Sequence, residues 1–509
     1  MTISGRRIGA FAAGLVLTAA AGLATAQSSQ QQAAMQQAMQ KAEALSQQQI
    51  ESSHDEAALV RLARLYAAAG DKQRYRWTLK QLTRLVPGSM QLKLQLAASY
   101  ASDDMKTPAY DILLGMKGLG FGVDLSKAPQ FEKIHGTEVW DYIVKSLQAN
   151  MKTFGEGKKA FDLPAADLMF NALAWDPVHK KFLVGSARDG SIHHADMQGK
   201  LGDFIRSDKQ NRLWSIMDMA VDARHKRLWV ATTSVVYFKG YDTNNANQAA
   251  LVEFDLASGK FLHRYPLAGS GVYLSSVAVA PDGTVYAADG VNKALYTVHQ
   301  GKLEEIARNP LLSEIGALAI SSDGSKLYLA DTQKGVIGFD LKTKKAFGLA
   351  YNPDALVLPG IVDMHSYKNT LVVIEPGMQP RRVMRLKLSG DGREVTSAMP
   401  LDVANPVFET LGKGAVVGHK IYYIANDQRS KYDQYGMLKE GAVLEPVHVF
   451  VSDMDFAWDQ RGINTGMKKI PGASPAEGKK MLDAPPDKGR RALPGKKKTD
   501  NILMQQGHK

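Results

Sequence analysis

The sequence VAVAPDGTVYAAD occupies residues 277–289, and LAISSDGSKLYLAD occupies residues 318–331, about 41 residues further along. Each stretch consists of an apolar run, an Asp-Gly pair and a second apolar run. An Asp-Gly pair between alternating hydrophobic runs is typical of a β-hairpin, because the tight turn needs a positive φ that glycine adopts without a steric penalty. The two stretches therefore predict the same antiparallel hairpin twice.

Hairpins of this kind recur through the central part of the chain. Further copies cover residues 173–185, 219–230, 362–373 and 415–424. A hairpin that returns every 40 to 50 residues or so, with more β sequence between the copies, is typical of the blades of a β-propeller. The six copies predict a closed six-bladed β-propeller over residues 161–452. The fifth and sixth copies are weaker, so seven blades, or five and a partial one, remain alternatives.

Residues 55–155 show a helical period. The apolar positions of one helix pair return after about 34 residues, so that Leu62 corresponds to Leu96 and Tyr66 to Tyr100. This spacing resembles that of tetratricopeptide repeats. The first copy departs from that family, because Tyr75 replaces its small residue in the second helix. Two copies are too few to stack alone, so we favour a helical cap packed on its neighbour over a peptide-binding groove.

The predicted fold class is thus a multidomain α plus all-β protein, a short tetratricopeptide-like helical domain followed by a six-bladed propeller. Residues 1–26 contain Arg6-Arg7, an apolar stretch and Ala24-Thr25-Ala26, the pattern of a signal peptide. Residues 27–54 form a Gln-rich helical leader. We therefore expect a periplasmic or secreted protein with no transmembrane segment. Both the general secretory route and the twin-arginine route remain open.

The chain carries a net charge of +12 and contains no cysteine. Disulfides, thiolate chemistry and zinc-thiolate sites are therefore excluded. Much of the positive charge lies in residues 458–509, which are rich in Gly, Pro and Lys and which we expect to be a disordered basic tail. Such a tail could bind an anionic envelope surface; the alternative is a solvated tail with no dedicated partner. Nucleic acid is not an expected partner of an exported protein.

The repeat also resembles a known group of propellers. AWDP at residues 174–177, FLVGS at 182–186 and DGSI at 189–192 are similar to the NHL, gluconolactonase and senescence-marker-protein group, and the resemblance covers roughly residues 165–450. It implies a six-bladed propeller. It implies little about function, because that fold serves lactonases, lyases and binding proteins alike.

Gluconolactonase-type enzymes hold a divalent cation at the channel mouth through a Glu, an Asn and an Asp at blade openings. Here Asn171 stands where that Glu would be, and Asp218 and Asp363 stand one residue away from the later openings. In a regular strand a one-residue slip turns the side chain to the opposite face. The candidate ligand-binding residues are Asn171, Asp218, Ser276 and Asp363. A metal such as calcium would take Asn171, Asp218 and Asp363, although we expect no metal or other cofactor, because such cations want several oxygens and carboxylates.

Other polar residues have more ordinary interpretations. His193 and His194 are neighbours on a strand, so they should point to opposite faces and not chelate together. Asp289, Asp331 and Glu375 each follow the second strand of a blade, where acids accept backbone N–H groups of turns. Two features stay open, the pair formed by Asp363 and His365, and the polar insertion at residues 241–248. A further candidate ligand mouth consists of Tyr422, Tyr423, Arg429, Lys431, Tyr432 and Tyr435.

These patterns favour an exported binding or scaffold protein. The helical repeats and the propeller mouth would hold a protein or a small-molecule ligand. The alternative is a metal-dependent hydrolase or lyase of the lactonase type in the propeller channel. The sequence contains no phosphate loop, dinucleotide fingerprint or nucleophile elbow in a strand–turn–helix setting, so enzymatic activity is an open question that leans towards none.

Overall fold

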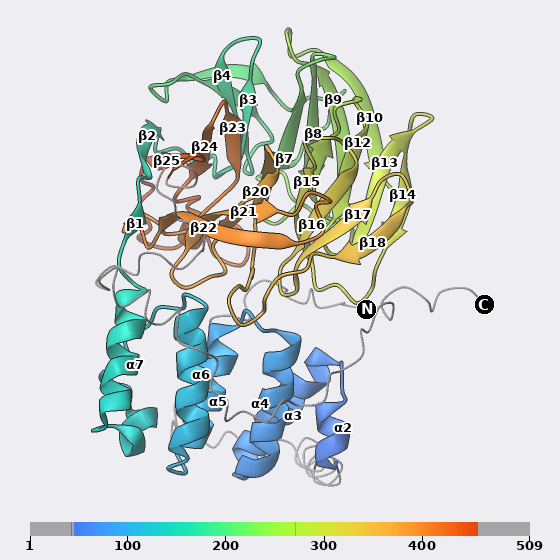
Figure 1. Ribbon diagram of the computed structural model, residues 1–509. Coiled ribbons are helices and arrows are strands. Elements are labelled where there is room, and N and C mark those ends of the chain that lie inside the picture. Colours follow the sequence, from blue (N-terminus) through green and yellow to red (C-terminus); the bar gives the residue numbers. More distant parts are fainter. Residues whose placement is uncertain (1–41, 43–44, 270, 457–509) are drawn as a thin grey trace, which may run out of the picture. The chain divides into compact units, whose positions relative to one another are not determined.

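The computed structural model describes residues 42, 45–269 and 271–456 (Figure 1). The predicted signal peptide, most of the Gln-rich leader and the basic tail at residues 458–509 lie outside the described residues. All helices and strands belong to one compact unit, Met1–Gly466. Among the residues that the structure describes, no helix combines the length and the apolar character that spanning a membrane takes.

The helical region begins with side-chain caps that match its sequence. The carboxylates of Asp55 and Asp71 and the hydroxyl of Ser89 accept a backbone N–H at the start of three successive helices, which satisfies donors that the first turn leaves free. Gly70 ends the first of them with φ +70°. The helices are α2 Gln47–Glu51, α3 Glu56–Ala69, α4 Lys72–Leu85, α5 Met90–Ala101, α6 Lys106–Gly118, η1 Pro129–Ile134 and α7 Glu138–Ala149.

Six antiparallel sheets, the blades, follow. In the description of each blade below, the strand named first is the innermost one, and we call it the first strand of the blade. Blade 1 contains β3 Phe170–Asp176, β4 Lys181–Ser186, β5 Ile192–Ala195 and β6 Leu201–Ile205. Blade 2 contains β7 Ser215–Asp222, β8 Arg227–Thr233, β9 Ala249–Asp255 and β10 Phe261–Leu267. Blade 3 contains β11 Leu274–Val279, β12 Val285–Asp289, β13 Ala294–His299 and β14 Lys302–Arg308.

The last three sheets complete the ring. Blade 4 contains β15 Ile315–Ile320, β16 Lys326–Asp331, β17 Gly335–Asp340 and β18 Lys345–Gly348. Blade 5 contains β19 Asp363–Tyr367, β20 Thr370–Glu375, β21 Arg382–Leu388, β22 Val395–Val403 and the short β1 Phe154–Gly155. Blade 6 contains β23 Gly414–Val417, β24 Lys420–Ile424, β25 Val447–Asp453 and β2 Lys158–Leu163.

The ring closes because the last blade includes a strand from the start of the propeller sequence. Strand β2 comes from the start of the propeller sequence and pairs with β25 at its end, with Phe161 opposite Val449. The first strands of consecutive blades contact one another around the whole circle, including β23 with β3. The prediction of six blades is therefore confirmed, and closure leaves fewer free sheet edges.

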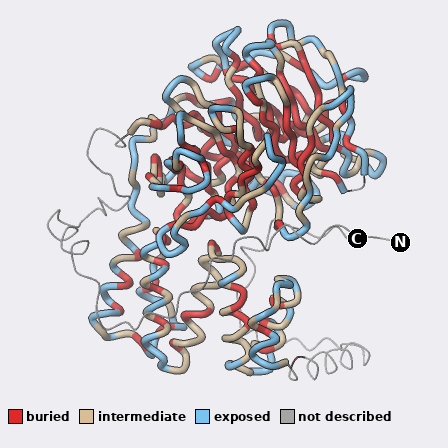
Figure 2. Tube along the Cα trace, turned by 45° about the vertical axis from the view of Figure 1, so that its right-hand side comes forward, coloured by how far each residue is buried: buried red, intermediate tan, exposed pale blue. Residues whose placement is uncertain are grey.

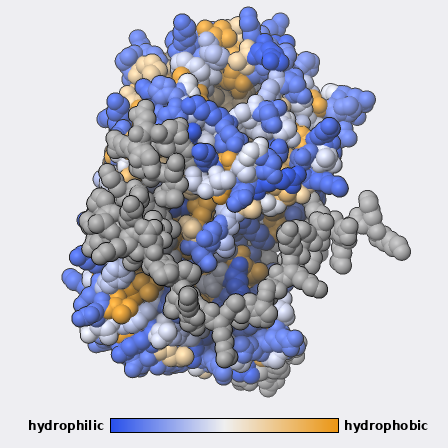
Figure 3. All heavy atoms as spheres, in the orientation of Figure 1, coloured by the Kyte–Doolittle hydropathy of each residue, from blue (hydrophilic) through white to orange (hydrophobic). Residues whose placement is uncertain are grey.

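The Asp-Gly turns have the conformation that the repeated stretches predict. Gly283 has φ +91° and Gly324 has φ +71°. In the first turn the Gly283 N–H donates to the Ala280 carbonyl at 2.9 Å. The strands on either side are almost entirely buried, and Figure 2 shows buried residues concentrated in the propeller strands. On the face seen in Figure 3, hydrophilic residues predominate and apolar ones occur in small groups.

The helical region packs against blades 4 and 5. Val357 and Met378 of the propeller belong to the same buried cluster as residues of α5, α6 and α7. The Gly122 N–H donates to the Gln379 carbonyl at 2.9 Å, and a side chain at Gly88 would collide with Pro359 at 2.5 Å. These contacts agree with a helical cap. The tetratricopeptide resemblance itself stays a prediction.

Phe182 lies at the junction of blades 1 and 6. It is fully buried, and its ring centroid lies 5.2, 5.0 and 4.8 Å from those of Phe161, Trp175 and Tyr422. We expect Phe182→Ala to lower the free energy of unfolding by about 3–5 kcal/mol, because it opens a cavity where the ring closes. Urea denaturation measures this. Tyr435→Ala, at a residue 71% exposed, should change it by less than about 0.5 kcal/mol; equal effects would contradict the packing.

Candidate functional site

A lysine lies across the centre of the propeller. The Lys413 ammonium, at the start of blade 6, lies 3.2 Å from the Asp218 carboxylate of blade 2 and 4.0 Å from the Asp363 carboxylate of blade 5. It also donates to the Ser275 carbonyl of blade 3 at 3.3 Å. Blade 6 neighbours only blades 5 and 1, so contacts with blades 2 and 3 run across the central channel. All three charged side chains are less than a tenth exposed.

Both carboxylates accept hydrogen bonds from the protein. One oxygen of Asp218 accepts the Ser276 hydroxyl at 2.6 Å and the Val277 N–H at 3.0 Å, and the other accepts the Met219 N–H at 2.9 Å. Asp363 accepts the Gly414 N–H at 2.7 Å. Protein donors thus hold these oxygens in place around the ammonium. We call Asp218, Ser276, Asp363, His365 and Lys413 the channel cluster.

β-Bulges explain how Asp218 reaches this cluster. The pairing of the two innermost strands slips by one residue in blades 1 to 4. In blade 2, Ile216 pairs with Thr232 and Asp218 with Ala231, so Met217 is the extra residue. A bulge shifts the alternation of side chains. The one-residue argument against Asp218 assumed a regular strand and therefore does not apply here.

His365 forms an ion pair with Asp363 inside the channel. Its Nε2 lies 2.7 Å from the Asp363 carboxylate. Burial lowers the pKa of His365, but the carboxylates of Asp363 and Asp218 outweigh it, and the net pKa is raised. Burial likewise raises the pKa of Asp363, but His365 and Lys413 bring it well below its ordinary value. The His365 side chain is 26% exposed, so solvent in the channel reaches it.

Arg429 spans the mouth of the channel. It lies between β24 and β25 of blade 6, and its guanidinium donates to the Asn171 side chain of blade 1 at 2.9 Å. Its own partner is Asp427 at 3.3 Å. It also interacts with residues of three other blades, and these with Arg429 and Asn171 form the mouth cluster. The further members are Tyr237, Tyr273 and Glu314.

Charge and burial set the state of the mouth cluster. Asp427 raises the pKa of Arg429 although partial desolvation lowers it, so the half-exposed guanidinium is a permanent cation. Burial, together with Asp331, raises the pKa of Glu314 to about 6. Burial raises the pKa of Tyr273 to about 12, so its hydroxyl stays neutral. The mouth therefore offers hydrogen-bond donors and acceptors side by side.

The β8–β9 loop of blade 2, ahead of the insertion at residues 241–248, is joined through Arg188 to the loop between β24 and β25. The buried Arg188 guanidinium donates to the Tyr237 carbonyl at 2.5 Å and to the Gly436 carbonyl at 2.8 Å. It also forms an ion pair with Asp167 at 2.7 Å and lies over the Tyr432 ring at 4.9 Å. Two long loops are thus held in one arrangement beside the mouth.

The tyrosines of the further candidate ligand mouth differ in their surroundings. Tyr435 is 71% exposed, whereas Tyr423 is buried in blade 6, where its hydroxyl donates to Asp402 at 2.7 Å.

The structure brings together three of the four candidate residues. Asp218 bonds Ser276 directly, and Lys413 links Asp218 to Asp363. Asn171 belongs instead to the mouth cluster, where its amide also donates to the Ile216 carbonyl at 3.3 Å. The proposed ligand set of Asn171, Asp218 and Asp363 is therefore not assembled around one point, and the Lys413 ammonium lies between the two carboxylates.

Lys413 was not among the candidate residues, whereas Arg429 belonged to the further candidate ligand mouth of the sixth blade. Lys413 precedes Gly414-Ala415-Val416-Val417 by the offset at which Asn171 precedes Ala172-Leu173-Ala174-Trp175. Extending the offset to the sixth blade would have found it. The sequence does not show which blades Arg429 contacts, because apart from Asp427 its partners lie in other blades. The expected role of Asp331 is confirmed, since it accepts the Ser313 N–H at 2.6 Å and the Lys334 N–H at 2.8 Å.

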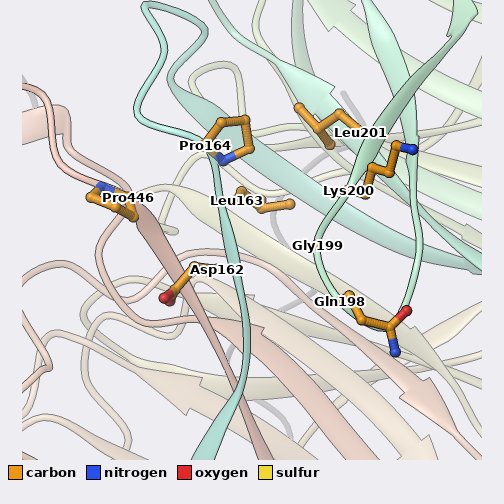
Figure 4. Close-up of a pocket in the computed structure, with 8 residues that line it drawn as sticks. All are labelled: Asp162, Leu163, Pro164, Gln198, Gly199, Lys200, Leu201 and Pro446. Atoms are coloured by element: carbon orange, nitrogen blue, oxygen red, sulfur yellow. The ribbon is translucent and has the colours of Figure 1, made fainter.

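A surface hollow lies away from both clusters. It has a volume of about 360 Å³ and follows the seam where β2 of blade 6 meets the β5–β6 turn of blade 1 (Figure 4). Asp162 on its rim is engaged by His448 at 2.6 Å and by Lys159 at 2.8 Å. Its lining includes none of the candidate residues, and its carboxylate is already paired, so we place the site in the channel. The lining residues are Asp162, Leu163, Pro164, Gln198, Gly199, Lys200, Leu201 and Pro446.

In comparisons with known proteins, matches were found among solved structures alone. No protein-family model and no curated protein matches the sequence. The PQQ-bound aldose sugar dehydrogenase of Streptomyces coelicolor is 14% identical with a TM-score of 0.38, covering 59% of this chain and 98% of its own. Virginiamycin B lyase of Staphylococcus aureus is 12% identical with a TM-score of 0.37, covering 53% and 82%. At these scores the likeness supports no conclusion about ligand or activity.

The raised pKa of His365 predicts a pH-dependent stability. The unfolded imidazole titrates near about pH 6.5, so the stabilisation by His365 is fully present below that pH and is lost as the pH rises through the folded pKa. The difference in unfolding free energy between the wild type and His365→Gln should therefore shrink as the pH rises above about 6.5. Urea denaturation across pH tests this. The exposed His299→Gln is the control, and a constant difference for His365→Gln would contradict the ion pair.

Replacing Lys413 should convert the channel into a calcium-responsive site. Lys413→Met leaves the buried Asp218 without a cation and Asp363 with His365 alone, which costs about 3–5 kcal/mol. Millimolar calcium should then raise the melting temperature of the variant and leave the wild type unchanged. Lys387→Met, at an exposed residue, is the matched control. A calcium response of the wild type that Asp218→Asn removes would contradict the role of Lys413.

Proposed function

We propose that this protein is an exported binding protein that holds a small, neutral, hydroxyl-rich ligand, such as a sugar, at the mouth of its propeller channel. The observation that supports this most is that each cation of the channel and mouth clusters is paired with a carboxylate. The pairs are Lys413 with Asp218, His365 with Asp363, and Arg429 with Asp427, at 3.2, 2.7 and 3.3 Å.

Paired charges favour a neutral ligand. A site whose cations are already compensated gains little from a ligand with net charge, since that ligand must also be desolvated. The same ion pairs present N–H donors and carboxylate acceptors together, which suits hydroxyl groups that both donate and accept. Tyr237 and Tyr273 add aromatic surface with a polar end. Sugars and related polyols have this combination of groups.

The surroundings of the mouth agree with a binding role. In an antiparallel blade, the segment before the first strand and the loop after the second lie at the same end. Glu314 of the mouth cluster precedes β15, while Gln379 and Lys334, which contact the helical region, follow second strands. The helical cap is thus attached at the mouth end, where it borders the path of a ligand or a protein partner. Export rests on residues 1–26, and a role of the basic tail at an anionic envelope surface rests on composition.

A second candidate is a hydrolase or lyase that uses His365 as a general base at a pH above its raised pKa, where the imidazole is neutral. Nε2 of His365 is held by Asp363, and its Nδ1 has no hydrogen-bond partner among the described residues. A carboxylate that orients a histidine is the usual arrangement for general acid–base chemistry. In this form no divalent cation is needed, because Lys413 supplies the positive charge.

A thermal-shift panel of neutral sugars, sugar lactones, dicarboxylates and diamines tests the proposal. We expect a neutral member to raise the melting temperature. Arg429→Ala should weaken that ligand at least about tenfold, equivalent to about 1.4 kcal/mol, because the cation spanning the mouth is lost. Arg308→Ala, on the outer strand β14, is the matched control. Binding of charged members alone, or of none, would contradict the proposal.

Turnover separates the two candidates. Hydrolysis or elimination of a bound lactone that His365→Gln reduces at least a hundredfold, with binding retained, would establish the enzyme. Ligand recovered unchanged after prolonged incubation supports the binding protein.

A further inference from the structure

Two histidines and an aspartate converge at the far end of blade 1. Asp176 ends β3, whereas the mouth residues lie near the starts of innermost strands or in loops after second strands, so Asp176 lies at the end of the channel strands remote from the mouth. Its Oδ2 lies 2.6 Å from Nδ1 of His179 and 3.0 Å from Nε2 of His194. The three side-chain atoms all lie within 4.8 Å of one another.

The two carboxylate oxygens of Asp176 have different partners. Its Oδ1 accepts the Val178 N–H at 2.8 Å and the His179 N–H at 3.2 Å, which shapes the turn between β3 and β4. Within the described part of the chain, its Oδ2 accepts no backbone N–H and contacts only the two imidazoles. The turn thus holds one carboxylate oxygen in place and leaves the other for a ligand.

His194 reaches this point from a different strand. It lies on β5, its ring stacks on Phe204 at a centroid distance of 4.1 Å, and it is buried. As predicted, its neighbour His193 points the other way and contacts the Ser191 hydroxyl at 2.8 Å. The two adjacent histidines do not chelate together, but His194 and His179 come together across the blade.

Blade 2 contains the same Asp–His turn as blade 1 but has no histidine at the position that corresponds to His194. Nδ1 of His225 lies 2.6 Å from Asp222, as in the Asp176–His179 pair. The position that corresponds to His194 is occupied by Glu253, which is engaged by Arg227 at 3.0 Å. The Asp–His pair alone is therefore an element of the turn. The buried His194 is what distinguishes blade 1.

We propose that Asp176, His179 and His194 bind a divalent transition-metal ion of the zinc class. Two imidazole nitrogens and one carboxylate oxygen are a zinc ligand set that leaves a fourth position for water. The His179 side chain is 33% exposed, so that position opens to solvent. On binding, each imidazole presents an unprotonated nitrogen to the ion, and its remaining proton moves to the other ring nitrogen. The site lies at the opposite end from the proposed ligand and is independent of it.

Zinc titration of the chelator-treated full chain tests this. Calorimetry should show one tight ion per chain, and cobalt should give the visible absorption of a tetrahedral site. His194→Gln should weaken binding at least tenfold, and the half-exposed His179→Gln should do the same if the first variant fails to fold. His225→Gln, in the repeated turn of blade 2, should bind zinc like the wild type. Unchanged affinity in both blade 1 variants, equal loss in His225→Gln, or no zinc binding would overturn the proposal.

Discussion

The interaction on which the centre of the propeller depends is the contact of one ammonium group with several blades. Lys413 joins blade 6 to Asp218 of blade 2, to Asp363 of blade 5 and to a carbonyl of blade 3. Burying three charges is costly unless they are paired and hydrogen-bonded. Here backbone N–H groups and the Ser276 hydroxyl complete the carboxylates. The centre of the ring is thus a satisfied polar network, surrounded by apolar contacts between blades.

This network determines what the channel can do. Carboxylates that already have a cation and several donors are poor partners for a further ion, whereas they remain good acceptors for a hydroxyl group. Above them, Arg429 interacts with residues of four other blades and is itself paired with Asp427. The helical region is attached at this same end. The mouth is therefore the part of the molecule where separate elements converge.

The sequence predicted the fold better than the site, for physical reasons. Turns such as Asp282-Gly283 and the strands beside them are local, so the repeat could be read directly from residues close together in the chain. The candidate site depended on which way a side chain points near the start of each first strand. That direction changes at a bulge such as Met217 in blade 2, and a bulge arises from pairing with a partner strand.

The contacts of Lys413 and Arg429 were not predicted, for a common reason. Lys413 belongs to the weakest repeat, and its partners lie in blades distant in sequence. Arg429 lies in a long loop whose position is fixed by Arg188, itself on blade 1. Asp218, Ser276 and Asp363 could be predicted because each sits at a repeated offset, but their common partner could be found only from the closed ring.

A crystal structure from crystals soaked in manganese, with anomalous data, tests the central claim most directly. The account predicts the Lys413 ammonium between the carboxylates of Asp218 and Asp363, with no anomalous peak in the channel. A manganese peak between these two carboxylates, with Lys413 displaced, would contradict it.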